Sequence, residues 1–360
     1  MKVVVSAGGT GGHIYPALAI INKLKDNDKN CEILYIGTTD RMESSLIPNL
    51  GIKYVGIEML GIDRKNILKN VIVLNKYLSA KKKIKEILTK FNPDIVIGAG
   101  GYITAPVLTV AHNLGFKTLI HEQNILPGIT NKKLSKIVDK VCISLPDSIK
   151  YFDQEKTVYT GNPRSEEIIR VKPSKKSEYG LDDKKKLVII VMGSLGSTTM
   201  TKKIKQLLPA FNEKEYQVMI VTGKKYYDCY SDIKLPKNVI KVPFLENFIN
   251  ILKSADLIIS RAGASTIAEV TAIGLPAILV PSPYVTNNHQ YKNAKALEKV
   301  GACKVITEDE FNTDKILNGI DDIFIEKNYF NMKNSSKKLG VVDSASRVYN
   351  EIKKLVKEDI

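Results

Sequence analysis

A cluster of glycines with one histidine follows the first apolar run of the chain. Residues 3–5 are all valine, and the loop after them contains Gly8, Gly9, Thr10, Gly11, Gly12 and His13 before a helix-like stretch. Glycines allow a tight turn that brings backbone N–H groups close to a ligand, and a helix N-terminus favours negative charge. The segment predicts a phosphate-binding loop. His13 stands beside it, and an imidazole with a reference pKa of about 6.5 can take a proton from a hydroxyl group near neutral pH.

The spacing of these glycines excludes two common nucleotide-binding motifs. Gly-x-Gly-x-x-Gly requires a glycine where Ile14 stands, and no Gly-Lys-Ser/Thr follows. NAD-dependent enzymes and P-loop ATPases are therefore disfavoured. The alternative to a phosphate loop is a glycine turn that only connects a strand to a helix.

Other apolar runs also end in glycines or polar side chains. Gly98, Gly100, Gly101 and Tyr102 follow one run, and His121 to Asn124 follow another. The start of a helix near Ser265 offers N–H groups and the hydroxyls of Ser265 and Thr266 to a phosphate or a sugar. Glu269, one turn later, could accept both hydroxyls of a ribose. Its alternative interpretation is a helix acid stabilised by the helix dipole.

The sequence motifs do not favour a metal site or a catalytic nucleophile. His121-Glu122 lacks the second histidine of the zinc-protease motif, and no Gly-x-Ser-x-Gly is present. The pair Asp26 and Asp28 stands among lysines, as expected of a solvated turn. The four cysteines are far apart, so we expect reduced, buried thiols and neither disulfides nor a structural metal. They are Cys31, Cys142, Cys229 and Cys303.

The order of elements predicts an α/β protein with two Rossmann-like domains. Strand-like runs at 3–5, 33–36, 95–97, 118–120 and 140–143 alternate with helical stretches, which indicates a parallel sheet covered by helices. A polar stretch at 172–186 resembles a linker. The pattern then restarts with strands at 187–191, 217–221, 257–260 and 277–280. Two carboxyl edges that face each other would form a ligand-binding cleft.

Length and composition bound the class of protein. The chain has 360 residues, 44% of them hydrophobic and 26% charged, with a net charge of +16. That is enough for two domains with complete cores. No apolar stretch approaches the roughly 20 residues that span a bilayer, and the N-terminus lacks a signal-peptide pattern. We therefore expect a cytoplasmic location.

The positive charge of the first half is concentrated in one segment. Residues 1–163 hold 22 Lys and Arg against 14 Asp and Glu, and residues 64–90 alone hold 9 against 1. This segment carries two apolar stripes at helical spacing. One stripe is Ile67, Val71, Leu74 and Leu78, and the other is Val73, Tyr77, Ala80, Ile84, Ile87 and Phe91.

Two interpretations of the stripes remain open. Both are buried if the helix lies between a sheet and another element. Alternatively, the first stripe and the neighbouring lysines meet an anionic membrane surface. Nucleic acid is disfavoured because no aromatic residues alternate with the lysines in a stacking pattern.

Together these segments resemble the MurG family of glycosyltransferases. The resemblance covers nearly the whole chain in order. It rests on GGTGGHIYPALAI at 8–20, GAGGYITAP at 98–106, HEQN at 121–124, TGNPR at 160–164, SRAGASTIAE at 260–269 and HQYKNA at 289–294. It implies the GT-B fold, with an acceptor- and membrane-binding domain at 1–163 and a UDP-sugar-binding domain at 164–340. Residues 341–360 would form a C-terminal helix that packs back on the first domain.

The resemblance also implies a reaction. The enzyme would transfer N-acetylglucosamine, with inversion, from UDP-N-acetylglucosamine to undecaprenyl-pyrophosphoryl-N-acetylmuramoyl-pentapeptide, converting lipid I to lipid II in peptidoglycan and cell-wall synthesis. No cofactor and no metal would be required. The other partner would be the anionic inner membrane surface, with peripheral attachment at the cytoplasmic face of the cell membrane, and no nucleic acid would be bound.

Individual residues match the family's functional positions. His13 matches its candidate base, and Gly100, Gly101 and Tyr102 lie in its acceptor-side loop. Either Arg164 or Ser165 matches its arginine position. The donor-contacting positions are Thr10, Gly11, Gly12, Asn124, Arg164, Ser165, Ser194, Leu245, Gly263, Ala264, Ser265, Thr266, Glu269 and Gln290.

Three alternatives compete with this function. Another membrane-lipid glycosyltransferase or a UDP-N-acetylglucosamine 2-epimerase would share the fold. A non-catalytic sugar-nucleotide sensor would keep the donor loop but would not need His13.

Overall fold

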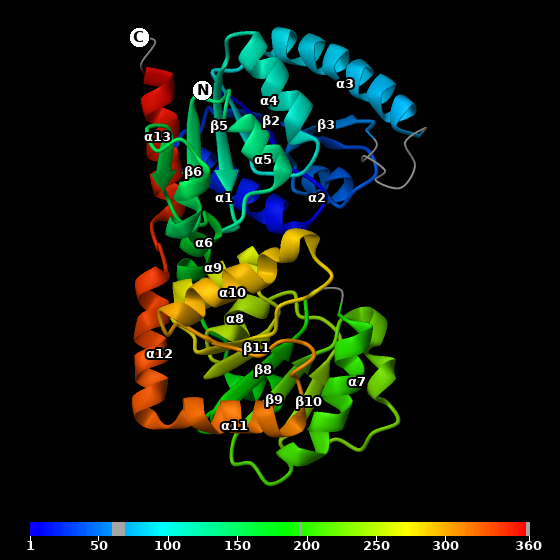
Figure 1. Ribbon diagram of the computed structural model, residues 1–360, viewed down its shortest axis with the longest axis vertical. Coiled ribbons are helices and arrows are strands. Elements are labelled where there is room, and N and C mark those ends of the chain that lie inside the picture. Colours follow the sequence, from blue (N-terminus) through cyan, green and yellow to red (C-terminus); the bar gives the residue numbers. More distant parts are fainter. Residues whose placement is uncertain (60–68, 194–195, 358–360) are drawn as a thin grey trace. The chain divides into compact units, whose positions relative to one another are not determined.

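The computed structural model describes residues 1–59, 69–193 and 196–357, with residues 69–74 and 286 described by their backbone alone. It forms two compact units (Figure 1). Unit 1 comprises Met1–Glu166 and Asp343–Ile360, and unit 2 comprises Glu167–Val342. The units therefore divide at 166/167 and 342/343, where the sequence suggested 163/164 and 340/341.

Unit 1 contains a seven-stranded, entirely parallel sheet in the order β3-β2-β1-β4-β5-β6-β7. Five of its strands coincide with the predicted runs, whereas β3 and β7 were not expected. Both of these are edge strands, and β3 is partly exposed. The strands are β1 (Lys2–Ser6), β2 (Glu32–Thr38), β3 (Lys53–Ile57), β4 (Ile95–Gly98), β5 (Lys117–Glu122), β6 (Lys140–Ile143) and β7 (Thr157–Tyr159).

Helices cover both faces of this sheet. Val3 and Val5 of β1 face a core shared with α1 and the C-terminal helix α13, and Val4 faces a core shared with α3, α4 and α5 (Figure 1). Val348 and Ile352 of α13 are fully buried. The helices are α1 (Gly11–Asn27), α2 (Glu43–Asn49), α3 (Lys69–Phe91), α4 (Thr104–Asn113), α5 (Ile129–Leu134), η1 (Pro146–Tyr151), α6 (Arg164–Arg170), which continues into unit 2, and α13 (Ser344–Lys357).

Unit 2 contains a six-stranded parallel sheet in the order β10-β9-β8-β11-β12-β13. Four strands were predicted, and the edge strands β10 and β13 were not. The prediction of an α/β protein with two Rossmann-like domains is confirmed. The strands are β8 (Leu187–Val191), β9 (Gln217–Val221), β10 (Val239–Val242), β11 (Leu257–Ser260), β12 (Ala277–Leu279) and β13 (Lys304–Val305).

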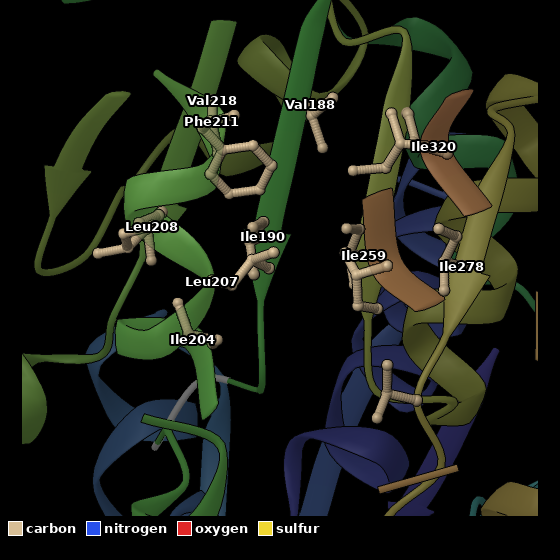
Figure 2. Packing of buried hydrophobic residues seen from close by; sticks show 14 of the residues in the cluster. Val188, Ile190, Ile204, Leu207, Leu208, Phe211, Val218, Ile259, Ile278 and Ile320 are labelled. Atoms are coloured by element: carbon tan, nitrogen blue, oxygen red, sulfur yellow. The ribbon is translucent and has the colours of Figure 1, made fainter. Parts of the chain in front are cut away.

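The main core of unit 2 lies between this sheet and helices α7 and α11. Figure 2 shows Ile204 and Leu207 of α7 and Ile320 of α11 beside the strand residues Ile190 and Ile259. The helices are η2 (Lys176–Tyr179), α7 (Thr198–Leu207), η3 (Leu208–Phe211), η4 (Lys224–Tyr226), η5 (Asp228–Tyr230), α8 (Phe248–Leu252), α9 (Ala264–Ile273), η6 (Thr286–Asn288), α10 (His289–Lys299), α11 (Thr313–Phe324) and α12 (Glu326–Leu339).

In each sheet the order in which strands are added reverses direction at the first strand. β1 lies between β2 and β4, and β8 lies between β9 and β11. In open parallel sheets, ligands bind outside the carboxyl ends of the strands at such a switch point. The loops after β1 and β4 in unit 1, and those after β8 and β11 in unit 2, are therefore expected to bind ligands.

The polar stretch at 172–186 is not a linker. Lys176 forms an ion pair with Asp256 at 3.2 Å, Asn250 Nδ2 donates to Lys172 O at 2.9 Å, and Ser174 N donates to Asn250 O at 3.0 Å. These contacts hold the segment on unit 2. The run of lysines was misleading because the charged end of Lys176 reaches a partner that is distant in sequence.

The basic helix α3 has one buried face. Ala80, Ile84 and Leu88 are buried against the sheet, so the second predicted stripe faces the core. Leu78 of the first stripe is 56% exposed. Ile67 lies outside the described residues, and Val71 and Leu74 are described by their backbone alone. The interpretation in which both stripes are buried is therefore wrong for Leu78, the one member of the first stripe whose side chain is described.

All four cysteines are free, but only Cys142 and Cys303 are buried; Cys31 is half-buried and Cys229 is exposed, so the prediction of buried thiols is wrong for Cys229 and only partly met by Cys31. Cys229 lies in the short η5 turn, which has no apolar pattern that would reveal its exposure. No helix in the described ranges is long and apolar enough to cross a bilayer.

Candidate active site

The loops after β1 and β4 are packed directly against each other in unit 1. Gly8 N donates to Gly100 O at 3.1 Å. A side chain at Gly101 would overlap the Gly8 carbonyl oxygen, and Gly101 has φ +93°, a conformation that favours glycine. The predicted loop residues of both segments therefore lie together at the switch point of the sheet.

The first glycine loop offers fewer N–H groups to a ligand than its sequence suggests. Gly8 N is used by Gly100, and Gly9 N donates to the Glu43 carboxylate at 3.1 Å. The N–H groups of Gly11 and Gly12 open helix α1, whose first turn carries no acidic residue. Any anion at this loop would bind to this helix start, where the positive end of the helix dipole lies.

His13 is held in one tautomer by the same loop. Its Nδ1 lies 3.1 Å from the Gly8 carbonyl oxygen. Because a carbonyl only accepts, Nδ1 carries the proton, and in the neutral ring Nε2 keeps its lone pair. A Cβ at Gly100 would come within 2.9 Å of Nε2, so the imidazole lies directly on this glycine. The arrangement suits a general base that works through Nε2.

A buried carboxylate that was not predicted supports this loop. Glu43, from helix α2, is fully buried. It accepts hydrogen bonds from Gly9 N, from Thr38 N at 3.2 Å and from Thr38 Oγ1 at 2.7 Å. Because Glu43 is separated from Gly9 by 34 residues, no local pattern could have revealed the contact.

The histidine near the end of β5 is structural. His121 is fully buried, donates from Nε2 to Gly161 O at 3.0 Å and accepts at Nδ1 from Gln123 Nε2 at 3.0 Å. Burial lowers the pKa of His121 to about 4, so the ring is neutral at physiological pH. It fixes the turn that precedes α6, and it is the opposite tautomer to His13.

Asn124 is oriented by the neighbouring Glu122. This carboxylate is buried and accepts from Asn124 N at 2.9 Å, from Gly128 N at 3.1 Å and from Asn131 Nδ2 at 2.9 Å. The bonds fix the loop after β5 at the carboxyl edge of the sheet. The Asn124 side-chain amide also donates to Glu122, at 3.3 Å.

The two candidates for the arginine position differ in exposure. Ser165 is buried, whereas the Arg164 guanidinium lies over the Tyr15 ring, 5.1 Å from its centre. Tyr15 belongs to the first turns of α1, so Arg164 is close to the first glycine loop. Tyr102, in the loop after β4, hydrogen-bonds to Arg41, which raises the pKa of Arg41.

In unit 2 the predicted donor residues follow neighbouring strand ends. Val191 pairs with Val221 and with Ser260, and Ser260 pairs with Leu279, so the loops after β8, β9, β11 and β12 emerge at one edge. Ser194 lies outside the described residues. Gly196, in the same loop, has φ +72° and packs against the Thr222 carbonyl oxygen, where a Cβ would not fit.

A buried ion pair joins three of these loops. Arg261, directly after β11, contacts Glu308 at 2.6 Å, and both side chains are at most 9% exposed. Arg261 also donates to Val280 O at 3.2 Å and to Ser197 Oγ at 3.3 Å. Ser197 caps helix α7 after the second glycine loop. Arg261 lies in the motif at 260–269, from which no role was predicted for it, and no pattern in the sequence pointed to Glu308.

Helix α9 begins at the next residues. Gly263 is its N-cap, its ten residues include Ala264 to Glu269, and its first turn carries no acidic side chain. The Ser265 hydroxyl is buried and has no hydrogen-bond partner within the described residues. Thr266 and Glu269 are partly exposed, with Glu269 at the sixth helical position. The N–H groups at this helix start could bind a phosphate.

The remaining predicted donor residues lie on the same edge. Leu245 is half-buried in the loop after β10. Gln290, on α10, accepts from Ser282 N at 2.9 Å, and Asn293 of the same helix donates to Ala262 O at 3.5 Å. Helix α10 is thus connected to the loop that starts α9.

Comparisons with known proteins show the family to which a chain with these two units belongs. The model of the glycosyltransferase family 28 N-terminal domain matches residues 3–143, and that of the C-terminal domain matches residues 187–348. A Bacillus cereus protein named UDP-N-acetylglucosamine–N-acetylmuramyl-(pentapeptide) pyrophosphoryl-undecaprenol N-acetylglucosamine transferase 1 is 43% identical over 99% of this chain and 100% of its own. The chain belongs to glycosyltransferase family 28.

Two further relatives agree. A transferase of the same activity name from Halalkalibacterium halodurans is 43% identical, covering 99% of this chain and all of its own. The crystal structure of MurG from Acinetobacter baumannii matches with a TM-score of 0.80 and 28% identity, over 98% of this chain and 99% of that one. The resemblance to the MurG family and the GT-B fold are confirmed, and the chain is a family 28 glycosyltransferase.

Proposed function

We propose that this family 28 enzyme transfers N-acetylglucosamine from UDP-N-acetylglucosamine to undecaprenyl-pyrophosphoryl-N-acetylmuramoyl-pentapeptide. The observation that carries the proposal is the 43% identity to transferases of that name over 99% of the chain. Full-length identity at this level favours the transferase over an epimerase or a sensor. Conversion of lipid I to lipid II in peptidoglycan synthesis follows from it.

Unit 2 would bind the donor. The start of α9, with Gly263, Ala264, Ser265 and Thr266, would hold the pyrophosphate through N–H groups and hydroxyls, and Glu269 would accept the ribose hydroxyls. The backbone of Leu245 would contact uracil, and Gln290 would contact the sugar nucleotide. Ser194, outside the described residues, would belong to the same set. Preorganised donors of this kind stabilise the charge that develops on departing UDP.

Unit 1 would bind the acceptor and supply the base. His13 Nε2 would take the proton of the acceptor 4-hydroxyl while its oxygen attacks the anomeric carbon and the bond to UDP breaks, which inverts the configuration. Gly100, Gly101 and Tyr102 would line the acceptor side. Thr10, Gly11, Gly12 and Asn124 would approach the donor from this unit, and Arg164 is favoured over Ser165 because the serine is buried.

The proposal can be tested by direct transfer. Purified enzyme is incubated with UDP-N-acetylglucosamine and a short-chain lipid acceptor, and UDP release and product mass are measured. His13→Ala should lower kcat roughly 10²–10⁴-fold, the usual contribution of a general base, while UDP affinity stays close to that of the wild type. His112→Ala is a matched control, because His112 lies at the opposite end of α4 from the glycine loops. Absence of transfer by the wild type would refute the function, and near-normal turnover of His13→Ala would refute the role of the base.

We also propose peripheral attachment to the anionic cytoplasmic face of the cell membrane through helix α3. The exposed side chain of Leu78 and the exposed lysines Lys82 and Lys85 support it. Lys76 pairs with Glu58 and Lys83 donates to Gly56 O, so these two are already engaged within the unit. Each lysine near an anionic surface adds about 1 kcal/mol, and inserted apolar side chains add to this.

The attachment is tested by sedimentation with vesicles. Changing Lys81, Lys82, Lys83 and Lys85 to Gln should release the protein from phosphatidylglycerol vesicles at low salt and leave UDP binding intact. Transfer to a water-soluble acceptor should persist, whereas transfer to vesicle-embedded acceptor should fall. A matched variant with four exposed lysines of the same unit changed to Gln, Lys132, Lys133, Lys136 and Lys150, controls for net charge. Equal loss of vesicle binding in both variants would show that binding depends on net charge alone and would refute a role of α3.

A further inference from the structure

One peptide group separates the candidate base from a buried carboxylate. The carbonyl oxygen of Gly8 accepts from His13 Nδ1 at 3.1 Å. The N–H of the same peptide unit, on Gly9, donates to Glu43 Oε2 at 3.1 Å. The chain of contacts therefore runs from the imidazole through a single peptide group to the carboxylate.

We propose that Glu43 is a positioning residue that acts on His13 through the Gly8–Gly9 peptide group. The inference rests on the proposed role of His13 as the base. In many enzymes a carboxylate contacts the catalytic imidazole directly and stabilises the imidazolium that forms. Here the peptide group transmits the effect, because hydrogen bonds in a chain polarise one another.

The contacts of Glu43 are those of an ionised carboxylate. Gly9 N, Thr38 N and Thr38 Oγ1 all donate to it, and a carboxylate accepts without donating. Glu43 is fully buried, and its negative charge is therefore weakly screened. When His13 takes the proton of the acceptor hydroxyl, the ring becomes positive, and the buried charge lowers the energy of that state.

The surrounding glycines allow Glu43, the Gly8–Gly9 peptide group and His13 to lie close together. A Cβ at Gly8 would lie 2.5 Å from Glu43 Oε1, and one at Gly37 would lie 2.7 Å from Glu43 Cγ. A Cβ at Gly100 would lie 2.5 Å from His13 Cδ2. Any side chain at these positions would displace either the carboxylate or the imidazole.

The other ionisable groups around Glu43 are either neutral or exposed, so they do not replace its buried charge. The hydroxyl groups of Tyr35 and Tyr54 donate to the carbonyl oxygens of Ala7 and Thr38, and burial raises the pKa of both phenols above their ordinary value, so they stay neutral. Asp40, Arg41 and Tyr102 lie farther out, where Asp40 and Arg41 are exposed and Tyr102 hydrogen-bonds to Arg41. Solvent screens the exposed charges more than that of Glu43.

The test measures the pH profile of kcat/KM. Its acid limb reports the pKa of the base in the free enzyme. Glu43→Gln removes the charge with little change of shape and should move this limb down by about one unit, with kcat roughly tenfold lower. Glu43→Asp keeps the charge, so its limb should stay near that of the wild type. Thr38→Val, which loosens the same pocket without removing the carboxylate, is the matched control and should also keep the limb in place.

A double substitution separates this role from a structural one. In the His13→Ala background, Glu43→Gln should change turnover less than about twofold, because the group through which Glu43 acts is absent. An unmoved limb in Glu43→Gln, or an equal loss with and without His13, would overturn the proposal. Wild-type transfer in the same assay tests the proposed function separately. UDP affinity and thermal unfolding are measured for every variant, so that a folding defect is distinguished from a shifted limb.

Discussion

The buried pair of Arg261 and Glu308 provides a prediction whose size follows from the structure. Their charged atoms are 2.6 Å apart and their side chains are 9% and 8% exposed. Removal of one partner from such a pair leaves an uncompensated buried charge and costs about 3–5 kcal/mol. Glu308→Leu should therefore destabilise unit 2 by this amount, since Arg261 then keeps, within the described residues, its weaker contacts to Val280 O and Ser197 Oγ.

The double substitution should cost less than either single one. Arg261→Met with Glu308→Leu removes both charges and fills the space with apolar side chains, which is often close to neutral for a buried pair. The single change Arg261→Met leaves a buried carboxylate that accepts a hydrogen bond from the Thr199 hydroxyl. We expect the double variant to recover more than half of the stability that either single variant loses.

Urea unfolding followed by far-ultraviolet circular dichroism measures the effect. With a slope of about 2 kcal/mol per molar, a loss of 3–5 kcal/mol lowers the midpoint of unit 2 by about 1.5–2.5 M. Asp321→Asn is the control, because its pair with Lys214 is 2.7 Å long but 49% exposed at the carboxylate and should cost at most about 1 kcal/mol. A double variant that loses the sum of both single effects would refute the reasoning.

Three further predictions concern other parts of the two units. Gly101→Ala forces a Cβ onto a positive φ and against a backbone carbonyl oxygen, so unit 1 should lose about 1–3 kcal/mol in urea unfolding, whereas Gly128→Ala, with open space around it, should not. Burial opposes the charge of Glu166, but hydrogen bonds from Lys23 and Ser346 outweigh it and lower its pKa. Its stabilisation is present above the unfolded pKa of about 4.3 and is lost as pH falls through the folded value, so Glu166→Gln should flatten the decline of stability below pH 5. Glu269→Ala should weaken UDP binding about ten- to a hundredfold in calorimetry but leave the binding of a 2′,3′-dideoxy analogue unchanged, and equal losses for both ligands would contradict the ribose contact.

The buried centre of each sheet could be predicted from sequence, whereas the edges could not. Residues 3–5 and 187–191 are continuous apolar runs because parallel strands are buried on both faces. The edge strands β7 and β13 have three and two residues, too few to show any period. The Gly-rich and polar segments after the central strands were found because parallel strands place all such loops on one edge.

The supporting carboxylates of the site had no signal in the sequence. Glu43 contacts a residue 34 positions away, and Glu308 contacts one 47 positions away. Both lie beside other polar residues, and Glu308 is followed directly by Asp309 and Glu310, so the sequence does not distinguish them from exposed acids and only folding shows that they are buried. The apparent linker at 172–186 misled for the same reason, since Lys176 reaches Asp256 across 80 residues.

The first glycine loop shows how a correct motif can have a different physical cause. Its glycines predict backbone N–H groups held open for a phosphate, yet the N–H groups of Gly8 and Gly9 are used within the unit. Gly8 is instead required by Glu43, and in the loop after β4 Gly100 is required by the His13 ring and Gly101 by the Gly8 carbonyl oxygen. The glycines are therefore needed because His13, the Gly8–Gly9 peptide group and the Glu43 carboxylate pack closely together. It follows that an alanine at Gly100 should impair the proposed base while the start of α1 stays free to bind an anion.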